Sequence, residues 1–292
     1  MVQRLLRKGT MTELRKRFLE DMQLRGLAPS TQTVYVCAIR QLAKHYRRSP
    51  DQLSEDEVRQ CFLHLTEVRK VSRSNATMTL CALKFFFERT LHRPWPVFSL
   101  ARPRKVRKLP TVLSHEEVRR LLECVEGPTF HLYFTTVYAC GLRREEARLL
   151  RVDDIDGARG LIHVRGKGAK DRWVPMPAVL LTQLREFWKT HRTRPWLFPH
   201  PGSLDRPRPL SRRALHLAFA AARERCGLKK HPVIHTLRHC YGTHLLEAGV
   251  NLRLIQANLG HTSADTTALY THLTAPALAT LRDPLNALMP GL

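Results

Sequence analysis

A proline-rich basic stretch at residues 92–110 limits this chain to folds with two separate parts. The stretch, HRPWPVFSLARPRKVRKLP, holds four prolines and, counting His92, seven basic residues. Because proline has no amide hydrogen and fixes its own φ, this density predicts neither a helix nor a regular strand. We therefore predict a basic linker at residues 94–112. Each side of it is long enough to bury a core of its own within the 292 residues.

Helical periodicity dominates residues 11–93, and residues 1–10 form a basic arm ahead of them. Apolar residues recur at i, i+3 and i+4, with glycine or capping residues at the ends. The predicted helices are residues 12–25, a helix opened by Pro29 with Val34, Ala38, Leu42 and Tyr46 on one face, a helix capped by Ser54 and Glu57, and residues 74–91. Four amphipathic helices with short connections predict a small helical bundle.

Residues 113–292 also read as mainly helical, with one β element. At residues 161–176, two β-prone runs flank a Gly-Lys-Gly turn, which predicts a hairpin. The predicted helices are one capped by Ser114 and Glu117, then residues 128–139, a short helix or turn at 143–150, and residues 178–191, 211–226, 236–248 and 252–259. A last helix would carry Tyr270. The apolar tail at residues 276–292 could pack within the chain or on a neighbouring protomer.

Charge points to a polyanionic partner. The chain has 49 Lys and Arg against 25 Asp and Glu, a net charge of +24. Nucleic acid is the simplest partner of such a chain, and an acidic membrane surface is the alternative. No apolar run reaches the roughly 18 residues that a membrane span needs, and the first ten residues lack a signal peptide's apolar core. Seven cysteines without C-x-x-C spacing predict reduced, buried thiols in the cytosol.

The stretch at residues 231–272 concentrates reactive side chains. It contains an H-x-x-R pair at His235 and Arg238, a Gly-His ending at His261, and Tyr270 nine residues later. A phenol, two imidazoles and a permanently charged guanidinium suit attack by an oxygen nucleophile on an anion. His235 and His239 have the helical spacing of a zinc pair, but Thr236 stands where the helical metalloprotease motif has glutamate. We therefore predict no metal.

Each of these residues also has a structural interpretation. A single buried histidine or tyrosine more often completes a packed core than performs chemistry. Arg143 lies three residues before Glu146, so a surface ion pair would account for it. Lys167 at a hairpin tip would ordinarily be solvated. The catalytic interpretation depends on all of these groups meeting.

The motifs H-x-L-R-H, L-G-H and T-T-x-x-Y-T-H resemble the C-terminal signature of the tyrosine recombinases, the phage integrase and Xer family of site-specific DNA recombinases. That family also has an arginine in G-L-R and a lysine in a G-K-G hairpin, which match Arg143 and Lys167. The resemblance implies six catalytic residues: Arg143, Lys167, His235, Arg238, His261 and Tyr270. In one departure, Arg144 and Glu145 stand where the family usually has an apolar and a small polar residue.

The resemblance implies a role for each residue. Tyr270 would attack the scissile phosphate and hold it as a 3′-phosphotyrosyl ester, so that neither ATP nor a metal is needed. Arg143 and Arg238 would bind the non-bridging oxygens, His235 and His261 would act as base and hydrogen-bond donors, and Lys167 would protonate the leaving 5′ oxygen. Candidate DNA-binding residues lie in the linker and after the hairpin turn: Arg102, Arg104, Lys105, Arg107, Lys108, Lys170 and Arg172.

The implied fold is mainly α: an N-terminal four-helix core-binding (SAM-like) domain at residues 11–93 and a catalytic domain at 113–292 with a small β-hairpin or sheet, the DNA breaking-rejoining enzyme fold. The implied partners are double-stranded DNA and a tetramer of this chain on recombination sites, with no cofactor and no membrane. The expected location is cytoplasmic, on the nucleoid. Two alternatives remain: a type IB topoisomerase-like relaxing enzyme, and a DNA-binding protein that kept the fold without catalysis.

Overall fold

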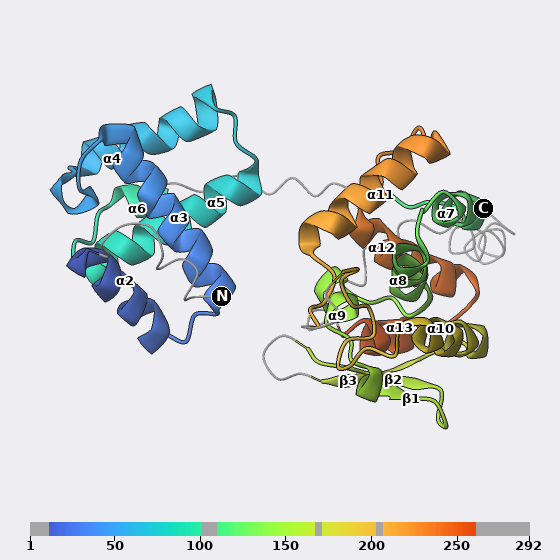
Figure 1. Ribbon diagram of the computed structural model, residues 1–292. Coiled ribbons are helices and arrows are strands. Elements are labelled where there is room, and N and C mark those ends of the chain that lie inside the picture. Colours follow the sequence, from blue (N-terminus) through green and yellow to red (C-terminus); the bar gives the residue numbers. More distant parts are fainter. Residues whose placement is uncertain (1–11, 101–109, 167–170, 203–206, 261–292) are drawn as a thin grey trace, which may run out of the picture. The chain divides into compact units, whose positions relative to one another are not determined.

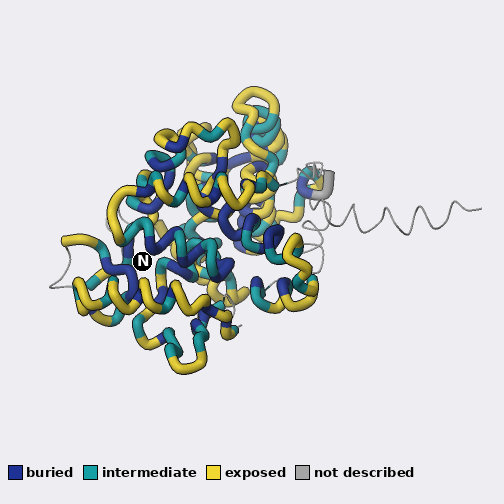
Figure 2. Tube along the Cα trace, turned by 90° about the vertical axis from the view of Figure 1, so that its right-hand side faces the viewer, coloured by how far each residue is buried: buried dark blue, intermediate teal, exposed yellow. Residues whose placement is uncertain are grey.

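The computed structural model describes residues 12–100, 110–166, 171–202 and 207–260. The chain divides into two compact units, Met1–Arg107 and Lys108–Leu292, and each is described by itself. Helices make up most of the described residues, and a short sheet lies in the second unit (Figure 1). Buried and exposed residues alternate along the helices, as amphipathic sequences predict (Figure 2). In the described ranges, no helix combines the length and the apolar character that crossing a membrane requires.

The first unit consists of helices joined by short turns. Its elements are α2 (Glu13–Leu24), α3 (Pro29–Tyr46), the short 3-10 helix η1 (Pro50–Gln52), α4 (Glu55–Leu63) running into the π-helical turn η2 (His64–Val68), α5 (Arg73–Phe85) running into the π-helical turn η3 (Phe86–Thr90), and α6 (Val97–Leu100). The predicted capping box before α4 is present: the Ser54 hydroxyl accepts from the amide of Glu57, and the Glu57 carboxylate accepts from the amide of Ser54. Helices α2, α3, α4 and α5 confirm the four predicted helices.

Two predictions for this unit were wrong. Val34 was expected on the buried face of α3, but it is 43% exposed, and Ile39 lies in the core instead. The linker was expected to hold no helix, but α6 forms at its start, where Phe98 is buried and Trp95 stacks on Phe87 at 4.3 Å. Packing of large aromatic side chains against the core outweighs the local effect of the prolines.

The second unit contains helices and a three-stranded antiparallel sheet. Its elements are α7 (His115–Glu123), α8 (Pro128–Ala139), α9 (Arg144–Arg148), the 3-10 turn η4 (Val152–Asp154), β1 (Ile155–Asp156), β2 (Leu161–Val164), β3 (Arg172–Pro175), α10 (Ala178–His191), α11 (Arg212–Cys226), α12 (Ile234–Glu247) and α13 (Leu252–Leu259). The predicted helices up to residue 259 are confirmed. So is the hairpin of β2 and β3, although β1 was not predicted.

The sheet has one buried and one open face. Its strand order is β1-β2-β3, and Ile162 pairs with Val174 on the buried face while His163 pairs with Trp173 on the open one. The base of the hairpin is held by Arg165, whose guanidinium donates to the buried carboxylate of Asp154 at 2.8 Å. The sheet lies at one end of the unit, next to α13 (Figure 1). The hairpin is therefore anchored beside the helix that precedes His261.

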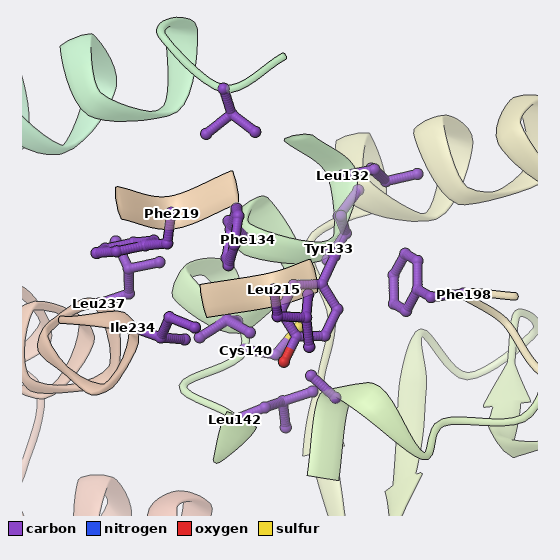
Figure 3. Close-up of a cluster of buried hydrophobic side chains, with 14 of the residues drawn as sticks. Leu132, Tyr133, Phe134, Cys140, Leu142, Phe198, Leu215, Phe219, Ile234 and Leu237 are labelled. Atoms are coloured by element: carbon purple, nitrogen blue, oxygen red, sulfur yellow. The ribbon is translucent and has the colours of Figure 1, made fainter. Parts of the chain in front are cut away.

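Helix α8 forms the centre of the second unit. It packs against α7, α9, α10 and α12, which explains why its sequence is apolar on nearly every side. Aromatic rings of α8, of α11 and of the segment between α10 and α11 meet there, with Phe134 edge-on to Phe219 at 5.2 Å and Tyr133 edge-on to Phe198 at 5.5 Å (Figure 3). This core fixes the C-terminal end of α8, from which the Gly-Leu-Arg segment leaves.

Candidate active site

The Gly-Leu-Arg segment is a tight turn between α8 and α9. Gly141 has φ +59°, and a Cβ atom on it would lie 2.3 Å from the Tyr241 ring of α12. The neighbouring Leu142 is fully buried. Only glycine combines this left-handed conformation with such a close approach. The turn thus packs α8 against α12 and directs the next side chain, Arg143, outward.

Arg238 lies beneath this turn. Its side chain is 1% exposed. Its guanidinium donates to the Gly141 carbonyl at 2.7 Å and to the Leu259 carbonyl at the end of α13. The H-x-x-R motif is therefore hydrogen-bonded to both the G-L-R and the L-G-H motifs, which are far apart in sequence.

Arg143 lies nearer the surface, with 41% of its side chain exposed. One terminal nitrogen donates to Glu146 at 2.7 Å and the other to the Gly260 carbonyl at 3.0 Å. The Glu146 carboxylate also accepts from the main-chain amide of Arg143 at 2.8 Å. The ion pair that the structural interpretation expected exists, but it also holds Arg143 beside the residue that precedes His261.

Glu146 is the centre of a cluster of charges that we call the Glu146 cluster: Arg143, Glu146, Arg172 and Arg238. Arg172 binds both carboxylate oxygens, at 3.0 and 2.9 Å, and a nitrogen of Arg238 lies 3.7 Å away. Burial alone would raise the pKa of Glu146, but hydrogen bonds from Arg172 and from the Arg143 amide outweigh it and hold this pKa at about 2. The carboxylate stays ionised and balances part of the positive charge.

Three successive carbonyl groups at the end of α13 are each bound by one arginine of the cluster. Arg172 donates to Asn258 at 2.7 Å, Arg238 to Leu259 and Arg143 to Gly260. The last carbonyls of a helix have no partner within it and carry partial negative charge, so cations are stabilising there. Gly260 has φ +62°, and a Cβ on it would lie 3.1 Å from the Arg172 side chain. The helix therefore ends at a fixed place, with Gly260 alone between its last residue and His261.

His235 is the second residue of α12 and lies on its exposed side, near these arginines. Desolvation by the surrounding protein, together with His239, Arg238 and Arg143, lowers the pKa of His235 to about 4, although the residue is exposed at the protein surface. The His239 ring lies edge-on to it at 4.7 Å, and burial also lowers the pKa of His239. His235 is therefore neutral at pH 7 in the protein alone and can accept a proton.

Two surface hollows meet at Arg143. The first, of about 440 Å³, runs from Arg143 to His235 and is also lined by His216 and Arg223. The second, of about 490 Å³, continues from Arg143 past Arg151 and Arg165 to Gly166. The first hollow has an excess of basic groups, with Arg143, Arg144 and Arg223 against Glu145, whereas Glu145, Glu146 and Asp154 balance the three arginines of the second. An anion placed on Arg143 would therefore meet further positive charge mainly on the His235 side.

The structure describes only part of the predicted site. It brings Arg143 and Arg238 together at Glu146, with His235 close enough for their charges to lower its pKa. The other predicted catalytic residues, Lys167, His261 and Tyr270, lie outside the described residues. So do six of the candidate DNA-binding residues: Arg102, Arg104, Lys105, Arg107, Lys108 and Lys170.

Arg172 was predicted to contact the DNA backbone, and its geometry does not favour that role. Its side chain is 12% exposed, and its guanidinium is bound to Glu146 and to the Asn258 carbonyl. A phosphate would have to displace a bidentate carboxylate to reach it. Sequence analysis considered Glu146 only as a partner for Arg143 and overlooked it as the centre of the cluster. Glu146 lies three residues after Arg143, which is the spacing of a capping box, and this spacing could have indicated that its carboxylate binds the start of α9.

A histidine group away from the Glu146 cluster has ligand atoms close enough to hold a metal. The ligand atoms of His115, His244 and Glu247 all lie within 4.8 Å of one another. His244, however, is bound through one nitrogen to the Tyr138 hydroxyl at 2.8 Å and through the other to the Leu113 carbonyl at 2.9 Å. These bonds fasten α12 to α8 and to the segment before α7, which accounts for the histidine without a metal.

Comparison with known proteins agrees with this architecture. Residues 111–276 match the model of the phage integrase family, and residues 14–97 match a phage integrase N-terminal SAM-like domain. The y4qK protein of Sinorhizobium fredii, which carries an integrase/recombinase name, is 39% identical over 95% of this chain and 90% of its own. Tyrosine recombinase XerC of Halalkalibacterium halodurans is 32% identical over 74% of this chain and 77% of its own.

Among solved structures, a lambda integrase dimer on a core site matches 88% of this chain and 93% of its own with a TM-score of 0.71. At 18% identity, that likeness shows a shared fold. Fold and sequence thus define the class as a two-domain integrase-type protein. The chain belongs to the phage integrase family of tyrosine recombinases.

Proposed function

We propose that this protein is a site-specific DNA recombinase that cuts and rejoins duplex DNA through a covalent 3′-phosphotyrosyl intermediate. One observation carries the proposal: the G-L-R, H-x-x-R and L-G-H motifs are joined by direct hydrogen bonds. Arg238 binds Gly141 and Leu259, and Arg143 binds Gly260. A chain that only bound DNA would need basic charge on its surface, but not two guanidinium groups fixed against each other by a shared carboxylate.

The two arginines would stabilise the charge of the phosphate during cleavage. Arg143 is the more accessible of the two and lies where the two surface hollows meet. Arg238 lies beneath it and is held rigidly. Donors that are already in place lose little orientational freedom when negative charge develops, and loss of one such donor typically costs about 3 to 4 kcal/mol of transition-state stabilisation. Loss of either arginine should abolish most of the cleavage.

His235 would serve as the proton acceptor or as a hydrogen-bond donor to the phosphate. Its lowered pKa leaves it neutral at pH 7, so its free nitrogen can take the proton of a phenol. A bound phosphate would add negative charge nearby and favour the protonated ring again. His261 would share this work from the position directly after the Gly260 turn.

Tyr270 is the best candidate nucleophile among the six tyrosines of the chain. The other five lie within the described residues, and burial raises the pKa of each of them, that of Tyr138 to about 12. Hydroxyl groups of these residues are also used within the fold: Tyr133 donates to the Arg144 carbonyl, Tyr46 donates to the Glu57 carbonyl, and Tyr138 is hydrogen-bonded to His244. A phenol that is buried or already bonded is a poor nucleophile.

The reaction needs neither a metal nor a nucleotide in this proposal. The Tyr270 oxygen forms a bond to phosphorus while the bond from phosphorus to the 5′ oxygen breaks, and the Lys167 ammonium gives its proton to that oxygen. The phosphotyrosyl ester keeps the energy of the broken bond, so a second 5′ hydroxyl can reverse the step on another strand. The hairpin that carries Lys167 is anchored by Arg165 and Asp154 at one end and by Arg172 at the other.

Double-stranded DNA is the proposed substrate and partner. The net charge of +24 suits it, and the candidate contacts remain Arg102, Arg104, Lys105, Arg107, Lys108 and Lys170. We propose the domain division already given: an arm at residues 1–10, a core-binding domain at 11–93, a linker at 94–112 and a catalytic domain from 113. The protein would act in the cytoplasm, on nucleoid DNA.

Assembly as a tetramer on paired sites is part of the proposal. A lambda integrase tetramer on a Holliday junction has been solved and shares this fold with a TM-score of 0.69. The C-terminal tail would contact a neighbouring protomer. A type IB topoisomerase activity is not favoured, because the curated relatives compared above carry integrase or recombinase names.

A nicked duplex substrate tests the proposal. When cleavage occurs next to a nick, a short fragment diffuses away and the covalent complex is trapped. DNA flanking the gene, offered as such substrates, should give a protein–DNA adduct that resists denaturant. Arg143→Ala and Arg238→Ala should lose the adduct while they still bind the DNA. Absence of any adduct with the wild-type protein, or site-independent plasmid relaxation by a monomer, would contradict the proposal.

A further inference from the structure

Arg172 differs from the other basic residues near the site because it is directed into the protein. It is the first residue of β3, and its side chain crosses to the end of α13 and to α9. The guanidinium lies against Gly260, where the missing side chain leaves room for it. Its contacts join β3 to Glu146, which is 26 residues away in sequence, and to Asn258, which is 86 residues away.

The contacts of Arg172 require the shape of a guanidinium and not only its charge. Two terminal nitrogens bind the two oxygens of Glu146, while Nε binds the Asn258 carbonyl. All three donor nitrogens belong to one planar guanidinium group. A lysine ammonium has one nitrogen at the end of a flexible chain, so it cannot hold the carboxylate bidentately and the carbonyl together.

The position of Arg172 links the parts of the site that sequence places far apart. On one side it fixes Glu146, the carboxylate that binds Arg143. On another it fixes the last turn of α13, which leads through Gly260 into His261. On the third it belongs to the strand that follows the hairpin turn of Lys167.

We propose that Arg172 is a positioning residue for DNA cleavage, which holds Glu146 and the turn before His261 in one fixed arrangement. The inference rests on the proposed recombinase function and adds a residue to it. Arg172 acts through Arg143 and through the α13 turn, and it does not touch the DNA. Displacement of a catalytic group by about 1 Å can cost about 100-fold in rate, which sets the expected scale of the effect.

The first test measures cleavage and binding separately. In Arg172→Gln and Arg172→Lys, we expect the rate of adduct formation at saturating nicked DNA to fall about 100-fold, while the dissociation constant and its salt dependence stay at the wild-type values. A residue that contacts a phosphate would instead weaken binding and reduce the salt slope by about one. Weaker binding with an unchanged cleavage rate would overturn the inference. So would full activity of Arg172→Lys.

A double-mutant cycle tests whether Arg172 acts through Glu146. The combined loss of rate in Arg172→Gln with Glu146→Gln should be smaller than the product of the two single losses, because each change removes the same contact. Multiplicative losses would show that the two residues act independently and would overturn the inference.

Hydrogen exchange tests the structural part without relying on catalysis. In DNA-free Arg172→Gln, the amides of residues 256–260 should exchange faster than in the wild type, while those of α8 stay protected. The matched control is Arg212→Gln, because Arg212 makes a bidentate pair with the neighbouring Glu145 but does not reach α13. It should leave exchange at residues 256–260 unchanged. Unchanged exchange in Arg172→Gln would overturn the inference. Absence of any adduct with the wild type would overturn only the recombinase function.

Discussion

Replacement of Glu146 by glutamine should make the stability of the protein less dependent on acid pH. The carboxylate is 8% exposed and its pKa is held at about 2, against an ordinary 4.5. Because its pKa is lowered in the folded state, the stabilisation is fully present above about pH 4.5 and is lost as the pH falls toward 2. The difference corresponds to about 3 kcal/mol at pH 7 and about 2 kcal/mol at pH 3.5.

Urea unfolding at several pH values measures this effect. Tryptophan fluorescence is a suitable signal, because Trp173, Trp188 and Trp196 all lie in the second unit. Glu146→Gln should be less stable than the wild type at pH 7, and the gap should narrow by about 1 kcal/mol between pH 7 and pH 3.5. Glu186→Gln removes an exposed carboxylate that pairs with Lys189 on the same helix and should change stability little. A gap that does not vary with pH would refute the reasoning.

Three further changes probe other parts of the site. Gly141→Ala should destabilise the protein by about 2 to 4 kcal/mol in urea unfolding, because the new Cβ would collide with Tyr241. Gly227 has a similar φ but open space around it, so Gly227→Ala should cost about 1 kcal/mol. Tyr133→Phe should cost about 1 kcal/mol through a lost buried hydrogen bond, and the variant should still form the covalent adduct. His235 should remain neutral at pH 5.5 in an NMR titration of the DNA-free protein, and a midpoint at its ordinary 6.5 would contradict the described surroundings.

Local sequence patterns were sufficient to predict most of the helices. Capping boxes at Ser54 and Ser114 and the left-handed glycines at the ends of α11 and α13 are determined within a few residues, so the chain itself reports them. The two-residue strand β1 pairs locally with β2, since Asp156 lies opposite Leu161, but it was missed because two residues are too few to show an alternating pattern. Helix α6 was missed because its stability depends on tertiary contacts: Phe98 is buried in the core of the first unit, and the proline-rich neighbours give no sign of it.

The sequence motifs identified candidate catalytic residues but not the Glu146 and Arg172 contacts that hold them in place. Spacing identified Arg143, His235 and Arg238 as candidates, since each lies in a short recognisable pattern. The role of Glu146 depends on Arg172, which approaches from a strand 26 residues away, and no local pattern reports such a contact. Arg172 was predicted to contact the DNA backbone because it belongs to the basic run that begins at the Gly-Lys-Gly turn. Its burial depends on the space left by Gly260, 88 residues later in the sequence.

Identification of the amino acid that becomes joined to DNA tests whether Tyr270 is the nucleophile. The trapped adduct can be digested with protease and nuclease, and the peptide that keeps a nucleotide can be sequenced by mass spectrometry. The account predicts a single modified residue, Tyr270, and no adduct in Tyr270→Phe. A phosphotyrosyl bond at Tyr138 or Tyr241, or an adduct that persists in Tyr270→Phe, would contradict it.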